Sequence, residues 1–172
     1  MIKVNLPLQK QTIRQLHAGD KVLLSGTVLT ARDCAHKRIM QYLNDNEPLP
    51  FDLKNAVVYY AGPCPAKPGF ASGSCGPTTS ARMETFAPAL IKTGLSAIIG
   101  KGEMCGEVRQ ALTENCGVYF AAVGGAGALY GSAITSCRCI AFGDLLSEAV
   151  YKLEIENFPV IVAYDCYGKS IY

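Results

Sequence analysis

The sequence lacks several features that would place it in common classes of protein. Lys and Arg number 16 and Asp and Glu number 14, so the net charge is only +2, and the basic residues do not cluster as a nucleic-acid-binding surface requires. Glycines interrupt the longest apolar run, VYFAAVGGAGALYG, which is too short to span a membrane. The N-terminal MIKVNLPLQKQT has no apolar core of a signal peptide. We therefore expect a cytoplasmic protein with no nucleic-acid or membrane partner.

Signals for metal binding and histidine chemistry are also scarce. None of the eight cysteines has C-x-x-C spacing, and thiols stay reduced in the cytoplasm. Cys137 and Cys139 are two residues apart, so on a strand they would face the same side, as small buried apolar residues rather than ligands. The histidines are His17 and His36, and neither belongs to a recognisable catalytic pair. His36 comes four residues after Arg32, which favours a structural role or one in orienting Arg32. We expect no metal site made by this chain alone.

What is present is the composition of a globular chain. Of the 172 residues, 49% are hydrophobic and 17% are charged, and a chain of this length can bury a substantial core. The sequence contains no internal repeat and no linker. We therefore predict a single domain over residues 1–172.

Apolar strand-like segments and amphipathic helix-like segments alternate along the chain. This alternation predicts an α/β fold with a mixed, partly parallel sheet. The expected strands are DKVLLSGTVLTA (20–31), AVVYYAG (56–62), LSAIIGKG (95–102), VYFAAV (118–123), CRCIAF (137–142) and FPVIVAYD (158–165). The expected helices cover 32–48, about 78–93, 103–117 and 144–155, with a short helix in GGAGALYGSAI.

Three cationic residues occupy comparable positions next to these elements. Arg32 follows one expected strand, Lys101 follows another, and Arg82 lies one turn into the helix after a long Pro- and Gly-rich loop. Ligands of open α/β sheets bind beyond the carboxyl ends of the strands, and a helix N-terminus offers unpaired N–H groups. With the hydroxyls of Thr78 and Thr79, these residues predict a site for a carboxylate or a phosphate. The alternative is a capped helix with a solvated arginine.

Two glycine-rich stretches fail the requirements of nucleotide-binding motifs. In GLSAIIGKGE, Gly102 stands where a P-loop needs Ser or Thr, and Lys101 ends a strand instead of opening a helix. The stretch GGAGALYG does not have G-x-G-x-x-G spacing. A nucleotide is therefore not the expected ligand.

Six strings, in this order, resemble one family: SGTVLTARDCAHKRI, VVYYAGPCP, GSCGPTTSARME, IIGKGE, VYFAAVGGAGAL and ENFPVIVAYD. They are similar to the C-terminal part of class I fumarate hydratases and to the β subunits of two-chain fumarases and L-tartrate dehydratases. The resemblance covers about residues 20–168. It implies a swivelling β/β/α fold, a reversible hydro-lyase reaction on a dicarboxylate, and an oxygen-sensitive four-iron four-sulfur cluster. It also implies a partner, an α subunit that holds the cluster through three cysteines, in an α2β2 assembly.

The resemblance implies roles for individual residues. Arg32 and Lys101 would bind substrate carboxylates, and Arg82 would bind a carboxylate close to the hydroxyl of Thr78. Thr78 would be the base that removes the C3 proton; because a free hydroxyl is a very weak acid, it would need the nearby cations to favour its alkoxide. A role for Thr78 in positioning the substrate is the alternative. His36 and Thr79 are expected to lie next to these residues and to help position them, without binding the substrate themselves.

The expected function is therefore that of a β subunit of an iron–sulfur hydro-lyase. The reaction expected first is the hydration of fumarate to (S)-malate. One alternative is the β subunit of an L-tartrate dehydratase, because both reactions need two carboxylate-binding groups. The other is a non-catalytic anion-binding module of the same fold.

Overall fold

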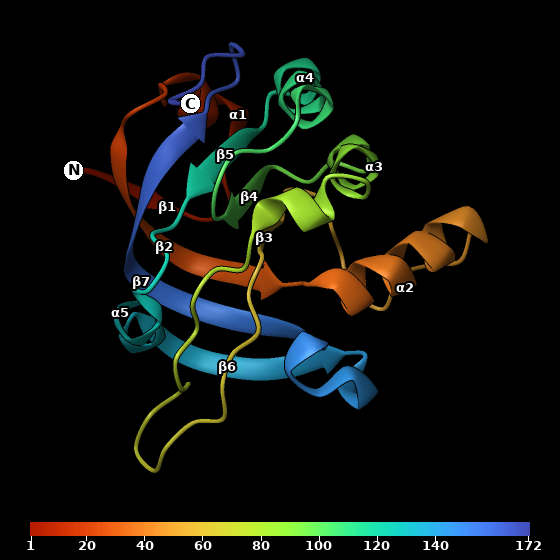
Figure 1. The fold of residues 1–172 in the computed structure, drawn as a ribbon, viewed down its shortest axis with the longest axis vertical. Helices are drawn as coiled ribbons and strands as arrows, with labels where there is room; N and C mark the ends of the chain where they lie inside the picture. Colours follow the sequence, from red (N-terminus) through yellow and green to blue (C-terminus); the bar gives the residue numbers. More distant parts are fainter.

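A computed structural model describes residues 1–172 and shows helices packed around a seven-stranded mixed sheet (Figure 1). The elements in chain order are β1 (Ile2–Asn5), α1 (Lys10–Arg14), β2 (Lys21–Thr30), α2 (Asp33–Asn44), β3 (Val57–Tyr59), η1 (Ser80–Met83), α3 (Ala87–Lys92), β4 (Ala97–Gly100), α4 (Gly106–Asn115), β5 (Val118–Ala121), α5 (Gly127–Ser132), β6 (Ile134–Ala141), η2 (Gly143–Glu148) and β7 (Val150–Tyr164). The structure has both helices and a sheet with parallel and antiparallel strands, which confirms the predicted α/β fold class. None of the helices has both the length and the hydrophobicity needed to cross a lipid bilayer.

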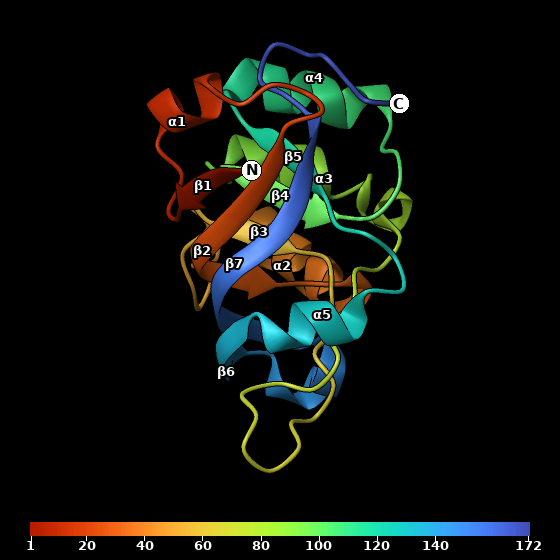
Figure 2. The same ribbon diagram turned by 90° about the vertical axis from the view of Figure 1, so that its left-hand side faces the viewer.

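The sheet closes on itself through its last strand. Strands β2, β3, β4 and β5 pair in parallel, one after the other, and β1 pairs in parallel with the first half of β2. Strand β7 runs antiparallel to β5 and also to β2, beside which it lies in Figure 2. The five strands β2, β3, β4, β5 and β7 therefore form a closed ring, and β6 extends the sheet from β7.

Successive side chains along the strands face opposite sides of the sheet, so the hydrophobic core consists of two clusters. Side chains such as Val57, Ile99 and Phe120 face the inside of the ring, where they join one buried cluster. Their neighbours, such as Val58 and Ile98, face α2, α3 and α4, which cover one side of the sheet (Figure 1). Both faces of β3, β4 and β5 are thus buried, which explains why these segments are almost wholly apolar in sequence.

Two of the predicted helices were wrong. The segment 144–155 forms the short turn η2 and the first part of β7, because pairing with β2 on one edge and β6 on the other outweighs its helix-like spacing of apolar residues. The helix expected over about 78–93 is broken into the four-residue 3₁₀ turn η1 and α3. Pro88 stands in the first turn of α3, where its missing N–H costs nothing and where it prevents a continuous helix from passing through.

The loop after β3 brings Thr78 to the ends of the parallel strands. This loop extends beyond β6 before it returns to the sheet (Figure 1). On its return, the N–H of Thr78 donates to the carbonyl of Tyr60 at 2.7 Å, and the N–H of Ser80 donates to the carbonyl of Lys101 at 2.9 Å. The loop end is therefore fixed between the residues that follow β3 and β4, at the rim where the parallel strands end.

Gly100 makes this close approach possible. A Cβ at Gly100 would clash with the Ser80 Oγ and would lie 3.2 Å from the ring of Tyr60. The same Ser80 hydroxyl accepts the N–H of Lys101 at 2.9 Å and lies 3.0 Å from the hydroxyl of Tyr119. A side chain at position 100 would therefore displace the segment that carries Thr78.

We predict that Gly100→Ala lowers the free energy of unfolding by about 1–3 kcal/mol, as overpacking does in tight cores. Urea denaturation measures this change. The control is Gly106→Ala at the start of α4, where a Cβ would meet nothing within 4 Å, so a change below about 1 kcal/mol is expected. Equal effects of the two substitutions would contradict the close packing of Ser80 on β4.

Candidate active site

The predicted site residues come from four separate places on one rim of the ring. Arg32 follows β2 and is the N-cap residue of α2, and Lys101 follows β4 directly. Thr78 ends the long loop, and Arg82 lies in η1. An isolated parallel bridge between Thr79 and Lys101 joins the loop end to the end of β4. The structure therefore places the ends of β2 and β4 and the end of the loop after β3 on the same rim. That Arg32 and Lys101 bind a ligand there stays a prediction.

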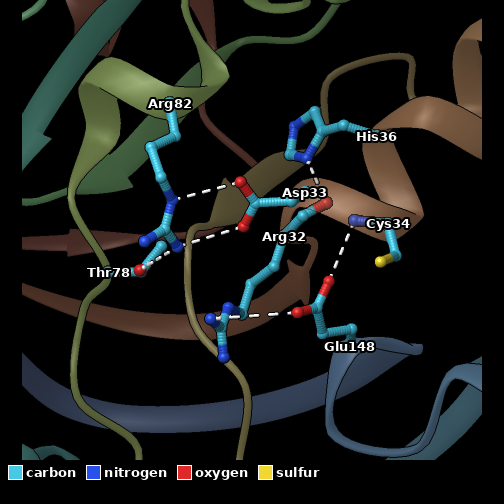
Figure 3. A network of polar contacts seen from close by, with 7 residues as sticks. All are labelled: Arg32, Asp33, Cys34, His36, Thr78, Arg82 and Glu148. Carbon is cyan, nitrogen blue, oxygen red and sulfur yellow. Dashed lines mark hydrogen bonds and ion pairs between the residues drawn. The ribbon is translucent and has the colours of Figure 1, made fainter.

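Thr78, Arg82 and Asp33 are linked directly through side chains (Figure 3). The Nη2 of Arg82 donates to the Thr78 Oγ1 at 2.7 Å. The same guanidinium donates through Nε to the Asp33 Oδ1 at 3.1 Å and through Nη2 to the Asp33 Oδ2 at 3.0 Å. A carboxylate of this chain thus fills one edge of the Arg82 fork. Sequence reasoning missed Asp33 as a site residue, although its place beside Arg32 in the ARD string was a usable signal.

The expectation of a helix N-terminus as part of the anion site was wrong. The element that follows Thr78 is a single 3₁₀ turn, and its N-cap residue Thr79 makes no capping hydrogen bond with its side chain. The N–H groups of Thr78 and Ser80 are already donated to backbone carbonyls. An anion at this rim would therefore not be held by the N–H groups of Thr78 and Ser80.

Arg32 has donors that are not used within the chain. Its Nε is buried without a hydrogen-bond partner, and its Nη2 lies 3.9 Å from the Glu148 Oε1, too far for a hydrogen bond. Glu148 is held instead by the N–H of Cys34, which donates at 2.9 Å and is the main cause that keeps the Glu148 pKa below its ordinary value. The Arg32 guanidinium passes close to Gly62, where a Cβ would lie 3.3 Å from the Arg32 Nη1. The result is a partly buried cation with free donors at the rim.

Lys101 is the second cation with free donors. Its ammonium group makes no ion pair and no hydrogen bond within the chain. Its stem packs beside Gly124, in the loop after β5, where a Cβ would lie 2.9 Å from the Lys101 Cδ. Two cations with unfilled donors, one on each side of Thr78 in the strand order, are a physical basis for binding a molecule with two anionic groups.

His36 lies behind Arg32, fully buried against two aromatic rings. Its Nδ1–H donates to the carbonyl of Arg32 at 2.8 Å, and its ring stacks on Phe86 at 5.6 Å and meets Tyr60 edge-on at 5.2 Å. Burial lowers the pKa of His36 to about 4, so the ring is neutral near pH 7. Its Nε2 has no partner within the chain. This geometry suits a residue that fixes the backbone of Arg32.

The cysteines form no ligand set for a metal or an iron–sulfur cluster. All eight are free thiols, and no group of three or more His, Cys, Asp or Glu side chains is placed to hold a metal ion. Cys137 is half-buried, but Cys139 is exposed because β6 is the last strand of the sheet, so the expectation of burial was wrong for Cys139. A four-iron four-sulfur cluster does not fit the residues of this chain by itself.

Comparison with known proteins identifies the family. The family described as "Fumarase C-terminus" matches residues 1–172. "Putative L(+)-tartrate dehydratase subunit beta" of Methanocaldococcus jannaschii is 44% identical over 171 residues, which cover 96% of this chain and 88% of that protein. "Fumarate hydratase 2" of Leishmania major is 38% identical, and "Fumarate hydratase class I, aerobic" of Escherichia coli is 33% identical, each over 99% of this chain. The chain belongs to the Fumarase C-terminus family.

The relatives differ in how much of their length this chain represents. The matched region is 31% of the Leishmania protein and 32% of the Escherichia coli protein. The chain thus spans about a third of these fumarate hydratases but most of the tartrate dehydratase subunit. All three names describe hydro-lyases, and about two thirds of each fumarate hydratase lies outside the matched region.

The buried His36 predicts a pH dependence of stability. Its pKa is about 4 in the folded chain, against 6.5 for an exposed histidine, so the unfolded state binds more protons between these values. The free energy of unfolding should therefore fall as the pH falls from 6.5 towards 4. Between pH 7 and pH 5, urea denaturation should show the wild type losing about 2 kcal/mol more than His36→Asn. A wild-type slope in His36→Asn would contradict this account.

Proposed function

We propose that this chain is the β subunit of a hydro-lyase that reversibly hydrates a four-carbon dicarboxylate. The observation that carries the proposal is one arrangement at the rim. The hydroxyl of Thr78 accepts a hydrogen bond from Arg82, and two cations with unused donors, Arg32 and Lys101, lie on the ends of β2 and β4. Membership of the Fumarase C-terminus family supports this reading.

The two cations with free donors suit the two carboxylates of the substrate. A guanidinium offers a planar fork to a carboxylate, and an ammonium offers a compact charge with three donors. We assign one carboxylate to Arg32 and the other to Lys101. Arg82 has less capacity for a carboxylate than the family resemblance implied, because its Nε and its Nη2 are already engaged.

Thr78 is proposed as the group that takes the C3 proton in the dehydration direction. Its alkoxide would accept the proton from C3 as the C–H bond breaks, and would return it in the hydration direction. A hydroxyl alone ionises far above neutral pH, but a charge-assisted hydrogen bond from the Arg82 Nη2 at 2.7 Å favours the alkoxide over the neutral hydroxyl. The substrate hydroxyl that leaves C2 is assigned to the partner chain.

The proposed partner is a cluster-bearing α subunit in an α2β2 assembly. The chain matches only about a third of the Leishmania and Escherichia coli fumarate hydratases, and its cysteines provide no cluster ligands. A second chain or domain would therefore hold the four-iron four-sulfur cluster. The name of the Methanocaldococcus protein, a subunit beta, is consistent with two chains.

Fumarate with (S)-malate is the first substrate proposed, and L-tartrate is the second. The fumarate hydratases among the relatives favour the first, and the relative at 44% identity, named as a tartrate dehydratase subunit, favours the second. Fumarate, (S)-malate and L-tartrate each carry two carboxylates, so the cations of the rim suit any of them.

Anaerobic co-expression with the candidate α subunit tests the proposed function. The assembled complex should turn over (S)-malate and fumarate, or L-tartrate, and this chain alone should turn over none of them. Activity of the isolated chain would contradict the need for a partner. A complex that binds dicarboxylates but converts none would instead support a non-catalytic anion-binding module.

Thr78→Ala should separate the chemical step from binding. We expect turnover to fall by roughly 10²–10⁴-fold, the usual size of a general-base effect, with KM within threefold of the wild type. Solvent deuterium should no longer exchange into C3 of malate, and Thr78→Ser should keep part of the rate. The control is Thr12→Ala on α1, which precedes β2 and so lies away from the residues that follow that strand, and it should lower turnover less than threefold. Exchange at the wild-type rate in Thr78→Ala would assign the base to another residue.

A further inference from the structure

We infer that Asp33 is a positioning residue that acts through Arg82: its carboxylate holds the guanidinium in the orientation that donates to Thr78. The inference rests on the proposed function, because it concerns the hydroxyl assigned to the C3 proton. Asp33 and Arg82 are 49 residues apart in sequence and meet only because α2 and η1 begin at the same rim. Figure 3 shows the three side chains in line, with Arg82 between Asp33 and Thr78.

The planar geometry of the guanidinium explains how a carboxylate on one edge directs a proton on the other. Asp33 takes the edge formed by Nε–H and one proton of Nη2, at 3.1 and 3.0 Å. The second proton of the same Nη2 lies in the same plane and points away from Asp33, and the Thr78 Oγ1 accepts it at 2.7 Å. Because the five N–H bonds form a rigid fork, fixing the Asp33 edge also fixes the direction of the proton given to Thr78.

The exposure of the pair argues that its purpose is orientation and not stability. The side chain of Arg82 is 48% exposed and that of Asp33 is 29% exposed. Ion pairs this open to water contribute little to the stability of a fold. Asp33 lies in the first turn of the twelve-residue α2, where the positive end of the helix dipole attracts a negatively charged side chain. The negative charge of Asp33 lies behind the guanidinium as seen from Thr78, so the alkoxide is closer to the cation than to the carboxylate.

The same helix carries a matched pair away from Thr78. Arg38 donates to both carboxylate oxygens of Asp144 at 2.7 and 2.8 Å, again in a two-pronged arrangement. The side chains of this pair are 33% and 65% exposed. Asp144→Asn therefore removes the same kind of interaction from α2 without touching the rim residues.

The test compares Asp33→Asn with Asp144→Asn in the complex assembled anaerobically with the α subunit. Asp33→Asn should lower turnover and deuterium exchange at C3 by about 10–100-fold, with KM within threefold, because Arg32 and Lys101 still hold the substrate. Asp144→Asn should leave turnover, exchange and KM within twofold. Neither variant should shift the midpoint of thermal unfolding by more than a few degrees.

Crystal structures of the two variants give a readout that does not depend on activity. In Asp33→Asn, the Arg82 Nη2 should no longer lie within hydrogen-bond distance of the Thr78 Oγ1, and in Asp144→Asn this contact should be unchanged. A contact retained in Asp33→Asn would overturn the inference, as would unchanged turnover or a rise in KM that matches the fall in turnover. If the contact is lost but the wild-type complex converts no dicarboxylate, the positioning by Asp33 stands and the proposed function fails.

In an Arg82→Lys background, Asp33→Asn should have less than a twofold effect on turnover, because the planar fork through which it acts is gone. A full effect of Asp33→Asn in that background would show that Asp33 acts by another route, and would overturn the inference.

Discussion

The pairing of β7 with both β2 and β5 is the constraint on which the rest of the structure depends. Without it, the four parallel strands would form an open sheet with two free edges. With it, the strands close into a ring, and the parallel pairing of β2, β3 and β4 puts the residues that follow β2 and β4 on one rim of this ring. The helices α2, α3 and α4 bury the outer face of this ring, so the rim is supported by one apolar cluster inside the ring and one outside it. Gly100 then lets the loop after β3 settle against β4 and deliver Thr78 to that rim.

The three cations of the rim differ in the hydrogen bonds that they already make within the chain. Arg82 is occupied by Asp33 and Thr78, whereas Arg32 and Lys101 keep donors that no group of the chain accepts. A cation that is held in place suits the control of a neighbouring hydroxyl, and a cation with free donors suits a substrate anion. This arrangement supports our proposal that the rim binds a dicarboxylate and moves one proton. The rim has no ligands for the cluster that the family resemblance implies. For this reason we propose that this chain provides one part of the active site and that a partner provides the cluster.

The sequence was sufficient to predict the parts of the fold that depend on local patterns. Apolar runs located β3, β4 and β5, and the rule that ligands bind beyond strand ends placed Arg32 and Lys101 on one rim. It was not sufficient where distant pairing decides the outcome. Residues 150–155 have helix-like spacing, but partners on both edges make them part of β7. The contact of Asp33 with Arg82 spans 49 residues, and the break before α3 removed a helix N-terminus that the pattern Thr78–Arg82 had suggested.

The most direct test of the central claim is a crystal structure of the assembled complex with a bound dicarboxylate. The account predicts one carboxylate on the Arg32 guanidinium, the other on the Lys101 ammonium, and C3 as the substrate carbon nearest to the Thr78 Oγ1. It also predicts that Arg82 still bridges Asp33 and Thr78 in that complex. A dicarboxylate held wholly by residues of the α subunit, with Arg32, Thr78 and Lys101 facing solvent, would contradict the account.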